Sequence, residues 1–141
     1  MKRVALLVAV LAVAFVMASG ATAFASTGVS TTDPTVHATK LKVTVPAKVK
    51  AKKSFTYSVS VTPIEAATYF DVIVEIRTKK GWKWADLTGF YEFFQPDGTF
   101  SGSYKLPKKG KFRFEVSTVP LTTPTDIYKY GLVHSRAITV K

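Results

Sequence analysis

The sequence contains no cysteine, and only two histidines and two tryptophans among its 141 residues. Without thiols the fold must depend on packing alone, so disulfide-rich scaffolds, zinc–thiolate sites and thiol catalysis are excluded. Acidic residues are also scarce, because nine aspartates and glutamates stand against 20 lysines and arginines. Such an excess of positive charge favours association with anionic partners and indicates nothing about the fold.

Long apolar runs are absent except at the amino terminus. There, Lys2 and Arg3 precede an apolar segment over residues 4–18 and the small-residue triplet Ala-Phe-Ala at 23–25. This order is typical of a secretory signal peptide, whereas a membrane-spanning helix needs about 20 apolar residues. We therefore predict a signal peptide helix over residues 1–25, with cleavage after Ala25. The alternative is an uncleaved amino-terminal anchor.

The mature chain is then predicted to span residues 26–141, the size of a single domain. Loss of Lys2 and Arg3 leaves 18 of the 20 basic residues against nine acidic ones, a formal charge of +9. Residues 26–39 are rich in Ser and Thr and lack apolar periodicity, which predicts a flexible leader before a folded domain at 40–141. We expect a secreted protein, released or associated with the cell envelope, with no integral membrane segment after signal cleavage.

Apolar residues recur at every second position through most of residues 40–141. This period predicts strands whose inward faces are 41–45, 55–61, 70–76 and 112–116, with a last strand at about 133–140. Turns are predicted at Lys79-Lys80-Gly81, Asp97-Gly98 and Lys108-Lys109-Gly110. No window shows a helical period. We predict an all-β, immunoglobulin-like antiparallel sandwich of about seven strands, with a small closed barrel as the competing architecture.

Several segments resemble the bacterial immunoglobulin-like domains of secreted and surface proteins. They are residues 72–76 with 79–83, Asp97-Gly98-Thr99-Phe100-Ser101, and Gly110-Lys111-Phe112-Arg113-Phe114. The resemblance implies a spacer, adhesion or ligand-presenting module without catalytic residues. The chain departs from such domains in the aromatic segment 89–95 and in the long segment 119–132, which a pure spacer does not need.

The residues that could carry catalysis are few and dispersed. His37 lies in the predicted leader and His134 near the last strand, and no nucleophile motif accompanies either. Acidic residues are scattered singly over turns and outward positions, as solvated charges are. Asp97 and Asp126 could meet in a weak calcium site, although turn chemistry alone explains Asp97. We predict no enzyme activity, no metal and no cofactor.

Lysines are concentrated in alternate connections of the predicted sandwich, which should fall at the same end. The first, third and fifth connections are residues 47–53, 79–81 and 107–110. With their flanks they hold 11 lysines and no acidic residue within any one loop, namely Lys48, Lys50, Lys52, Lys53, Lys79, Lys80, Lys83, Lys105, Lys108, Lys109 and Lys111. The first hypothesis is that this basic end binds an anionic envelope polymer; the alternative is a solvated turn face. No specific nucleic acid is expected.

Aromatic residues are concentrated in the remaining connections, at 89–97 and 119–132. The alternative hypothesis is that this opposite end binds another extracellular protein or a glycan through Phe90, Tyr91, Phe94, Tyr128 and Tyr130. About half of the aromatic residues in these connections could instead plug the end of the sandwich. Trp82 and Trp84 are expected in the core, with a carbohydrate platform as the alternative.

Overall fold

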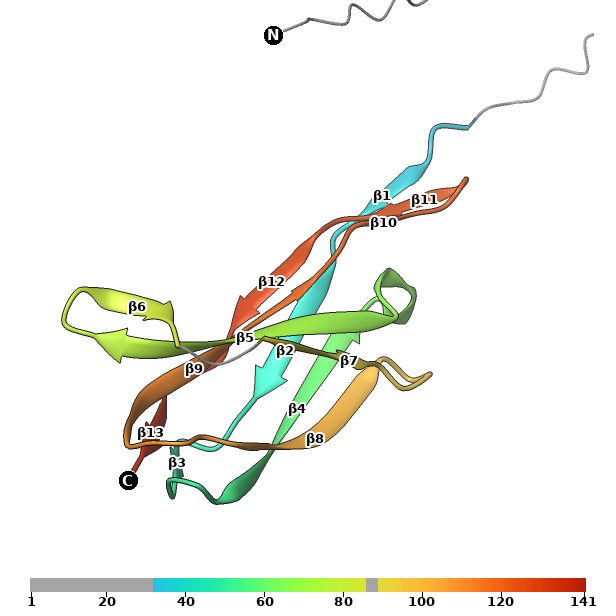
Figure 1. The fold of residues 1–141 in the computed structure, drawn as a ribbon. Coiled ribbons are helices and arrows are strands. Elements are labelled where there is room, and N and C mark those ends of the chain that lie inside the picture. The colour runs from blue at the N-terminus through green and yellow to red at the C-terminus, as the bar shows by residue number, and fades with distance from the viewer. Residues whose placement is uncertain (1–31, 86–88) are drawn as a thin grey trace, which may run out of the picture. The chain divides into compact units, whose positions relative to one another are not determined.

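The structure is a computed structural model that describes residues 32–85 and 89–141. The predicted signal peptide and the first part of the predicted leader lie outside these residues. The described chain consists of strands and one short 3-10 helix (Figure 1). The strands are β1 (Thr35–His37), β2 (Lys40–Thr44), β3 (Lys48–Val49), β4 (Ser54–Thr62), β5 (Tyr69–Thr78), β6 (Gly81–Trp84), β7 (Phe90–Phe93), β8 (Thr99–Lys105), β9 (Gly110–Thr118), β10 (Leu121–Thr122), β11 (Asp126–Tyr128), β12 (Gly131–His134) and β13 (Ile138–Val140), and helix η1 spans Ile64–Ala66.

Two sheets pack face to face, as the predicted sandwich requires. The smaller sheet has the order β2-β4-β8, and the larger sheet has the order β3-β13-β9-β5-β6 with β12 also paired to β9 and β7 to β5 (Figure 1). No strand is shared between these two sheets in the described residues, so the fold is a sandwich and not a closed barrel. The prediction of an all-β, immunoglobulin-like sandwich is therefore confirmed.

Strand interruptions explain why the structure has more strands than the seven predicted. β6 and β7 lie one after the other along the same edge of β5, opposite residues 75–78 and 69–72. β12 and β13 likewise follow one another along β9. The predicted last strand at 133–140 is thus broken in two at Ser135, whose amide donates to the Phe114 carbonyl while its hydroxyl accepts from the Phe114 amide.

The core lies between the inward faces that the period of two predicted. Its fully buried members include Phe70, Phe112 and Phe114. Across the two sheets, the ring centroids of Tyr57 and Phe114 lie 5.3 Å apart in an edge-to-face arrangement, which is a favourable aromatic geometry. Burial, and to a lesser extent the nearby Glu92 carboxylate, raise the pKa of Tyr57 well above its usual range.

The predicted turns are confirmed, and Gly98 shows why glycine is required at one of them. Gly98 has a φ of 75°, and a Cβ at this position would lie 2.7 Å from Cγ2 of Ile64 in η1. The preceding Asp97 accepts hydrogen bonds from the Thr99 hydroxyl (2.6 Å) and amide (3.0 Å). These bonds lower the pKa of the Asp97 carboxyl, and they account for this residue through turn chemistry.

Residues 35–39 belong to the folded domain, which corrects the predicted leader boundary at residue 39. β1 pairs in parallel with β11, and β11 pairs with β10, so half of the predicted long segment 119–132 is also strand. The His37 Nε2 atom lies 2.6 Å from Oδ1 of Asp126, and its ring stacks on Tyr128 at 4.9 Å. Polar strands at a sheet edge carry little apolar periodicity, so the sequence pattern did not indicate them.

Truncation of a buried phenylalanine should lower the free energy of unfolding much more than truncation of an exposed one. Because Phe114 is fully buried and Phe93 is 58% exposed, we expect Phe114→Ala to lower the free energy of unfolding by about 3–5 kcal/mol. The matched variant Phe93→Ala should lower it by less than about 1 kcal/mol. Urea unfolding measures both values, and equal losses would contradict the packing described here.

The contact between β1 and β11 should weaken in acid. Hydrogen bonds from Thr125 and then from His37 lower the pKa of Asp126, so the stabilisation is present above the ordinary carboxyl pKa and is lost as the pH falls through the lowered value. We expect hydrogen-exchange protection of the β1 amides to fall selectively as the pH drops below the ordinary carboxyl range, and Asp126→Asn to show reduced protection already at pH 7. Unchanged β1 protection across this acid titration, with the β4 amides as reference, would disprove this contact.

Candidate functional site

The structure brings the predicted lysine-rich connection 47–53 into contact with Leu106, which directly precedes the connection 107–110. The Lys52 amide donates to the Leu106 carbonyl at 2.8 Å, and the Ala51 amide donates to the Lys141 carbonyl at 3.0 Å. β3 also pairs in parallel with β13, which places Lys48 opposite Thr139. Backbone hydrogen bonds therefore connect residues 47–52, Leu106 and the carboxyl-terminal strand, which are far apart in the sequence.

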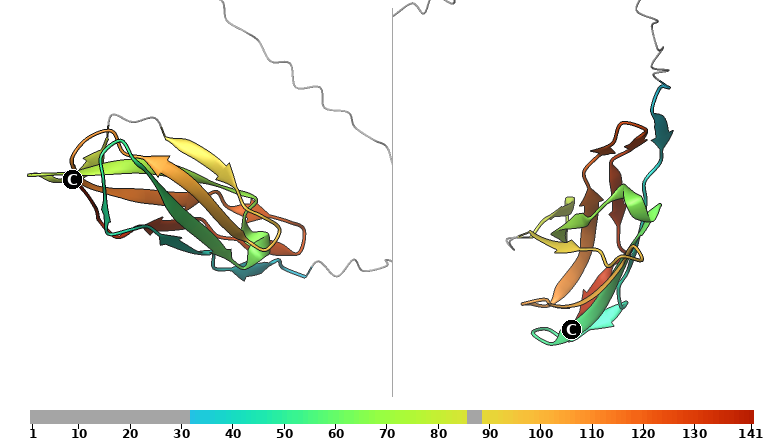
Figure 2. Two further views of the ribbon diagram at one scale, coloured as in Figure 1. Left: turned by 90° about the horizontal axis from the view of Figure 1, so that it is seen from below. Right: turned by 90° about the vertical axis from the view of Figure 1, so that its right-hand side faces the viewer.

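The third connection, between β5 and β6, projects from the same end of the domain. β5 and β9 are antiparallel and in register up to Ile76 and Phe112, so β5 ends where β9 begins. Figure 2 (left) shows the β3–β4, β5–β6 and β8–β9 connections on the side of the carboxyl terminus, away from η1 and the β10–β11 hairpin. We call this end the lysine pole; it comprises Lys48, Lys50, Lys52, Lys53, Lys79, Lys80, Lys83, Lys105, Lys108, Lys109 and Lys111.

Every lysine of the lysine pole is exposed to solvent, and none forms an ion pair with another described residue. One of them, Lys52, has a φ of 60° in the left-handed region, where a residue with a side chain is strained by about 1–2 kcal/mol. Its amide hydrogen bond to Leu106 helps to hold this conformation. The lysine pole is thus a set of solvated ammonium groups that have no ion-pair partner among the residues the structure describes.

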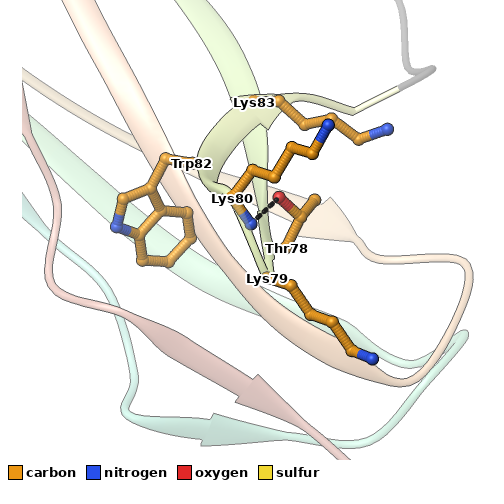
Figure 3. A pocket seen from close by; sticks show the side chains of 5 residues that line it. All are labelled: Thr78, Lys79, Lys80, Trp82 and Lys83. Carbon is orange, nitrogen blue, oxygen red and sulfur yellow. Dashed lines mark hydrogen bonds between the residues drawn. The ribbon is translucent and has the colours of Figure 1, made fainter.

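A shallow pocket at the β5–β6 hairpin combines ammonium groups with an aromatic ring. Its volume is about 420 Å³, and it is lined by Thr78, Lys79, Lys80, Trp82 and Lys83 (Figure 3). The Thr78 hydroxyl donates to the Gly81 carbonyl at 2.8 Å and accepts from the Lys80 amide at 3.3 Å, which braces the turn. The three lysine side chains extend away from the hairpin backbone in Figure 3.

Both tryptophans lie on the outer face of the larger sheet, so their predicted place in the core was wrong. In the β5–β6 register, Trp82 is opposite Arg77 and Trp84 is opposite Glu75, and these β5 residues point away from the core. Trp84 is 68% exposed. The Trp82 ring lies under the guanidinium carbons of Arg113, at 4.6 Å, and Arg77, at 5.6 Å, in cation–π contacts.

The five residues predicted as an aromatic binding end do not form one exposed surface. Phe90 stacks on Tyr104 at 5.1 Å and Phe94 packs on Phe70 at 4.8 Å, while Tyr128 is buried under β1. Tyr91 is 62% exposed, and Tyr130 is also largely exposed. The reason is that residues 90–93 form β7 and therefore alternate between the core and the outer face of the sheet.

A group of aromatic residues that the sequence analysis did not assemble lies beside Tyr91. Tyr69, Tyr91 and Phe93 surround a hollow of about 370 Å³ that Asp71 also lines. Tyr69 is opposite Phe93, and Asp71 is opposite Tyr91, in the β5–β7 register. We call these four residues the aromatic cage. The sequence places Tyr69 on the same face of its strand as the outward Asp71, because the two are two residues apart. The pairing of β5 with β7 was needed to show that Tyr91 and Phe93 lie beside them.

A network of charged residues occupies the same outer face between the two aromatic regions. Arg113 Nε donates to the Glu75 carboxylate at 2.5 Å, and His134 Nε2 lies 3.0 Å from a Glu115 oxygen. One ligand atom from each of Glu75, Glu115 and His134 lies within 4.8 Å of the others, a spacing that a metal ion could bridge. The Arg113 guanidinium already compensates the mostly buried Glu75 charge, so a structural ion pair accounts for the arrangement.

The described residues contain no nucleophile arranged beside a histidine. His37 bonds to Asp126 and His134 to Glu115, and no described hydroxyl group forms a hydrogen bond with either ring. Asp97 and Asp126, the alternative calcium ligands, each bind neighbouring threonines. In the described part of the chain, no helix is long and apolar enough to cross a membrane.

Comparisons with known proteins assign no family. No protein-family model and no curated protein matches the sequence. A superoxide reductase (neelaredoxin) from Ignicoccus hospitalis is similar in structure over 72% of this chain and 80% of its own, with 16% identity and a TM-score of 0.44. A CARDB domain from Pyrococcus furiosus, solved in complex with di-metal ions, is similar over 73% of this chain and 87% of its own, with 14% identity and a TM-score of 0.40. Likenesses of this size identify neither a family nor a function.

Removal of Arg113 should destabilise the fold, because Glu75 then loses its ion-pair partner. We expect Arg113→Met to lower the free energy of unfolding by about 2–3 kcal/mol, because a largely buried carboxylate then lies beside Glu115 uncompensated. Glu75→Gln in the same chain should restore at least about 1 kcal/mol. Urea unfolding of the single and double variants measures the coupling, and strictly additive losses would show that the pair contributes nothing.

Proposed function

We propose that this chain is a secreted, non-catalytic binding module that attaches to anionic polymers of the cell envelope through the lysine pole. The observation that carries the proposal is the convergence of three lysine-rich connections at one end of the sandwich. No described acidic residue lies in these connections. The resemblance of several segments to bacterial immunoglobulin-like domains supports an adhesive or ligand-presenting role of this kind.

The spread of the charges favours a polymer over a small anion. A single exposed ion pair contributes only about 0–1 kcal/mol, so one ammonium group gives little affinity. A polyanion engages many such groups at once, and each further contact forms at a high effective concentration. The lysines lie on separate connections and do not line one closed pocket, which suits a ligand with repeated charges along its length.

The hairpin pocket indicates an acidic glycopolymer among the possible polyanions. Trp82 lines this pocket together with Lys79, Lys80 and Lys83, and its ring projects from the hairpin on the side away from the three lysine side chains (Figure 3). A glycopolymer that crosses the hairpin can place one sugar against the indole ring and the carboxylate or phosphate substituents of neighbouring sugars near the ammonium groups. The cation–π contacts of Trp82 with Arg77 and Arg113 restrain the ring, which reduces the entropy lost on binding.

Charge reversal at the lysine pole should abolish this attachment. The test protein is residues 26–141, which include the whole compact unit 32–141, and the probes are immobilised polygalacturonate and poly(glycerol phosphate). Wild-type binding should weaken about tenfold or more between 50 and 300 mM NaCl because salt screens the charges. The variant Lys53→Glu/Lys80→Glu/Lys109→Glu reverses one charge per connection and should bind at least about tenfold more weakly at low salt. Lys52 is left unchanged because substitution there also alters backbone strain.

A matched control distinguishes the lysine pole from net charge. Lys40→Glu/Lys42→Glu/Lys129→Glu makes the same change in charge at three exposed positions outside the lysine pole, and it should retain most of the binding. Equal losses in both triple variants would replace the lysine pole with a general charge effect. Binding that persists in high salt, in both variants, would overturn the proposal and favour apolar attachment to a protein or glycan.

A further inference from the structure

The outer faces of the two sheets differ in a way that the fold does not require. On the smaller sheet, β4 and β8 place serine and threonine outward, as at Thr56 and Ser103. On the larger sheet, the corresponding outward positions of β5 and β7 hold the aromatic cage. Exposed aromatic side chains add nothing to the core, and a contiguous group of them is the usual mark of a binding site.

The three rings of the aromatic cage are steeply inclined to one another. The ring centroids of Tyr69 and Tyr91 are 6.4 Å apart with an interplanar angle of 74°. The corresponding values are 6.2 Å and 57° for Tyr69 and Phe93, and 5.8 Å and 83° for Tyr91 and Phe93. The rings thus contact one another at steep angles while lining the hollow, whereas a platform for a flat sugar face needs rings that lie roughly in one plane.

Asp71 supplies a negative charge to the hollow that the three aromatic rings line. Its side chain is half-buried and lines the same hollow, and it forms no hydrogen bond or ion pair with another described residue. Its neighbours in the sheet are Tyr91 on one side and Ser117 on the other. Among the described residues, the Asp71 carboxylate thus has no ion-pair partner in the hollow that the three aromatic rings line.

We propose that the aromatic cage binds a quaternary ammonium group of the choline type. Because the three centroids are separated by 5.8 to 6.4 Å, one cation at the open side of the hollow can lie within about 6 Å of all of them, the range of a cation–π contact. Asp71 provides the counter-charge. A methylated ammonium group sheds water more readily than a lysine ammonium and presents apolar surface to the rings, so the cage favours the quaternary form.

The binding test uses choline with a neutral isostere as its matched ligand control. Choline is titrated into residues 26–141, and the aromatic NMR signals of Tyr69, Tyr91 and Phe93 are followed. In parallel, 3,3-dimethyl-1-butanol, which has the same shape without the charge, is titrated. Choline should bind with a millimolar Kd, about tenfold or more tighter than the alcohol. Equal binding of the two ligands, or no choline-induced shift of these signals, would overturn the proposal.

Variants locate the binding in the aromatic cage. Tyr91→Ala and Asp71→Asn should each weaken choline binding about tenfold, while Tyr130→Ala, at an exposed aromatic residue outside the cage, should leave it unchanged. Both cage positions face solvent at least partly, and urea unfolding verifies that the variants fold. The lysine pole variant should bind choline normally, which separates this proposal from the proposed function. Signal shifts produced by glucose or galactose instead of choline would identify a sugar site and overturn the cation site.

Two further arms identify the source of the choline group. Phosphatidylcholine vesicles present it at a lipid surface, and free phosphocholine presents it in solution. Co-flotation of the wild-type protein, but not Tyr91→Ala, with the vesicles would assign a lipid head group. Binding of phosphocholine without co-flotation would assign a soluble or polymer-linked choline. Both results support the quaternary ammonium site, and failure of both probes contradicts it.

Discussion

β5 and β9 pair in antiparallel register at the centre of the larger sheet, from Asp71 opposite Ser117 to Ile76 opposite Phe112. Their inward residues, among them Phe70, Val74 and Phe114, are fully buried against the smaller sheet. Because each strand has a second partner on its other edge, this one pairing fixes the positions of β6, β7, β12 and β13 as well. Both candidate binding surfaces depend on it, since it sets the end at which the β5–β6 hairpin projects and the face on which Tyr69 and Tyr91 lie.

The same pairing divides the outer face of the larger sheet into regions of different chemistry. Trp82 and its two arginines lie next to the lysine pole, the ion pair of Glu75 with Arg113 follows, and the aromatic cage lies beyond it. The lysine pole and the aromatic cage with its Asp71 carboxylate therefore lie on one small domain. Because they are separated along β5, the positive charge of the lysine pole is largely screened from Asp71 by salt.

The inward faces and turns could be predicted from the sequence because their determinants are local. The period of two at Phe70, Val72 and Val74 is enough to predict the inward face of a strand. Glycine after two lysines is enough to predict a tight turn, because such a turn needs a residue that tolerates positive φ. The convergence of the lysine connections needed one further assumption, the alternation of strand direction in a sandwich.

The positions that escaped prediction depend on register between distant strands. Trp82 and Trp84 look like core residues by their apolar character, and only their pairing with Arg77 and Glu75 places them outward. Tyr69 lies opposite Phe93 only because β7 pairs with the edge of β5, and β1 pairs with a strand some 90 residues further along the sequence. Composition and periodicity carry no information on which edge a short strand will join, so the aromatic cage and the ordered part of the leader required the structure.

The carboxyl-terminal strand has a mechanical consequence. β3 and β13 run in parallel, joined by hydrogen bonds from Thr139 to Ala47, from Lys141 to Val49 and from Ala51 to Lys141. β1 lies at the opposite end of the domain (Figure 1). Tension applied between residue 32 and Lys141 therefore pulls β3 and β13 past each other along their length and loads these bonds together in shear, not one at a time as in peeling. A domain pulled at both termini would therefore resist extension until this short parallel ladder breaks as a unit.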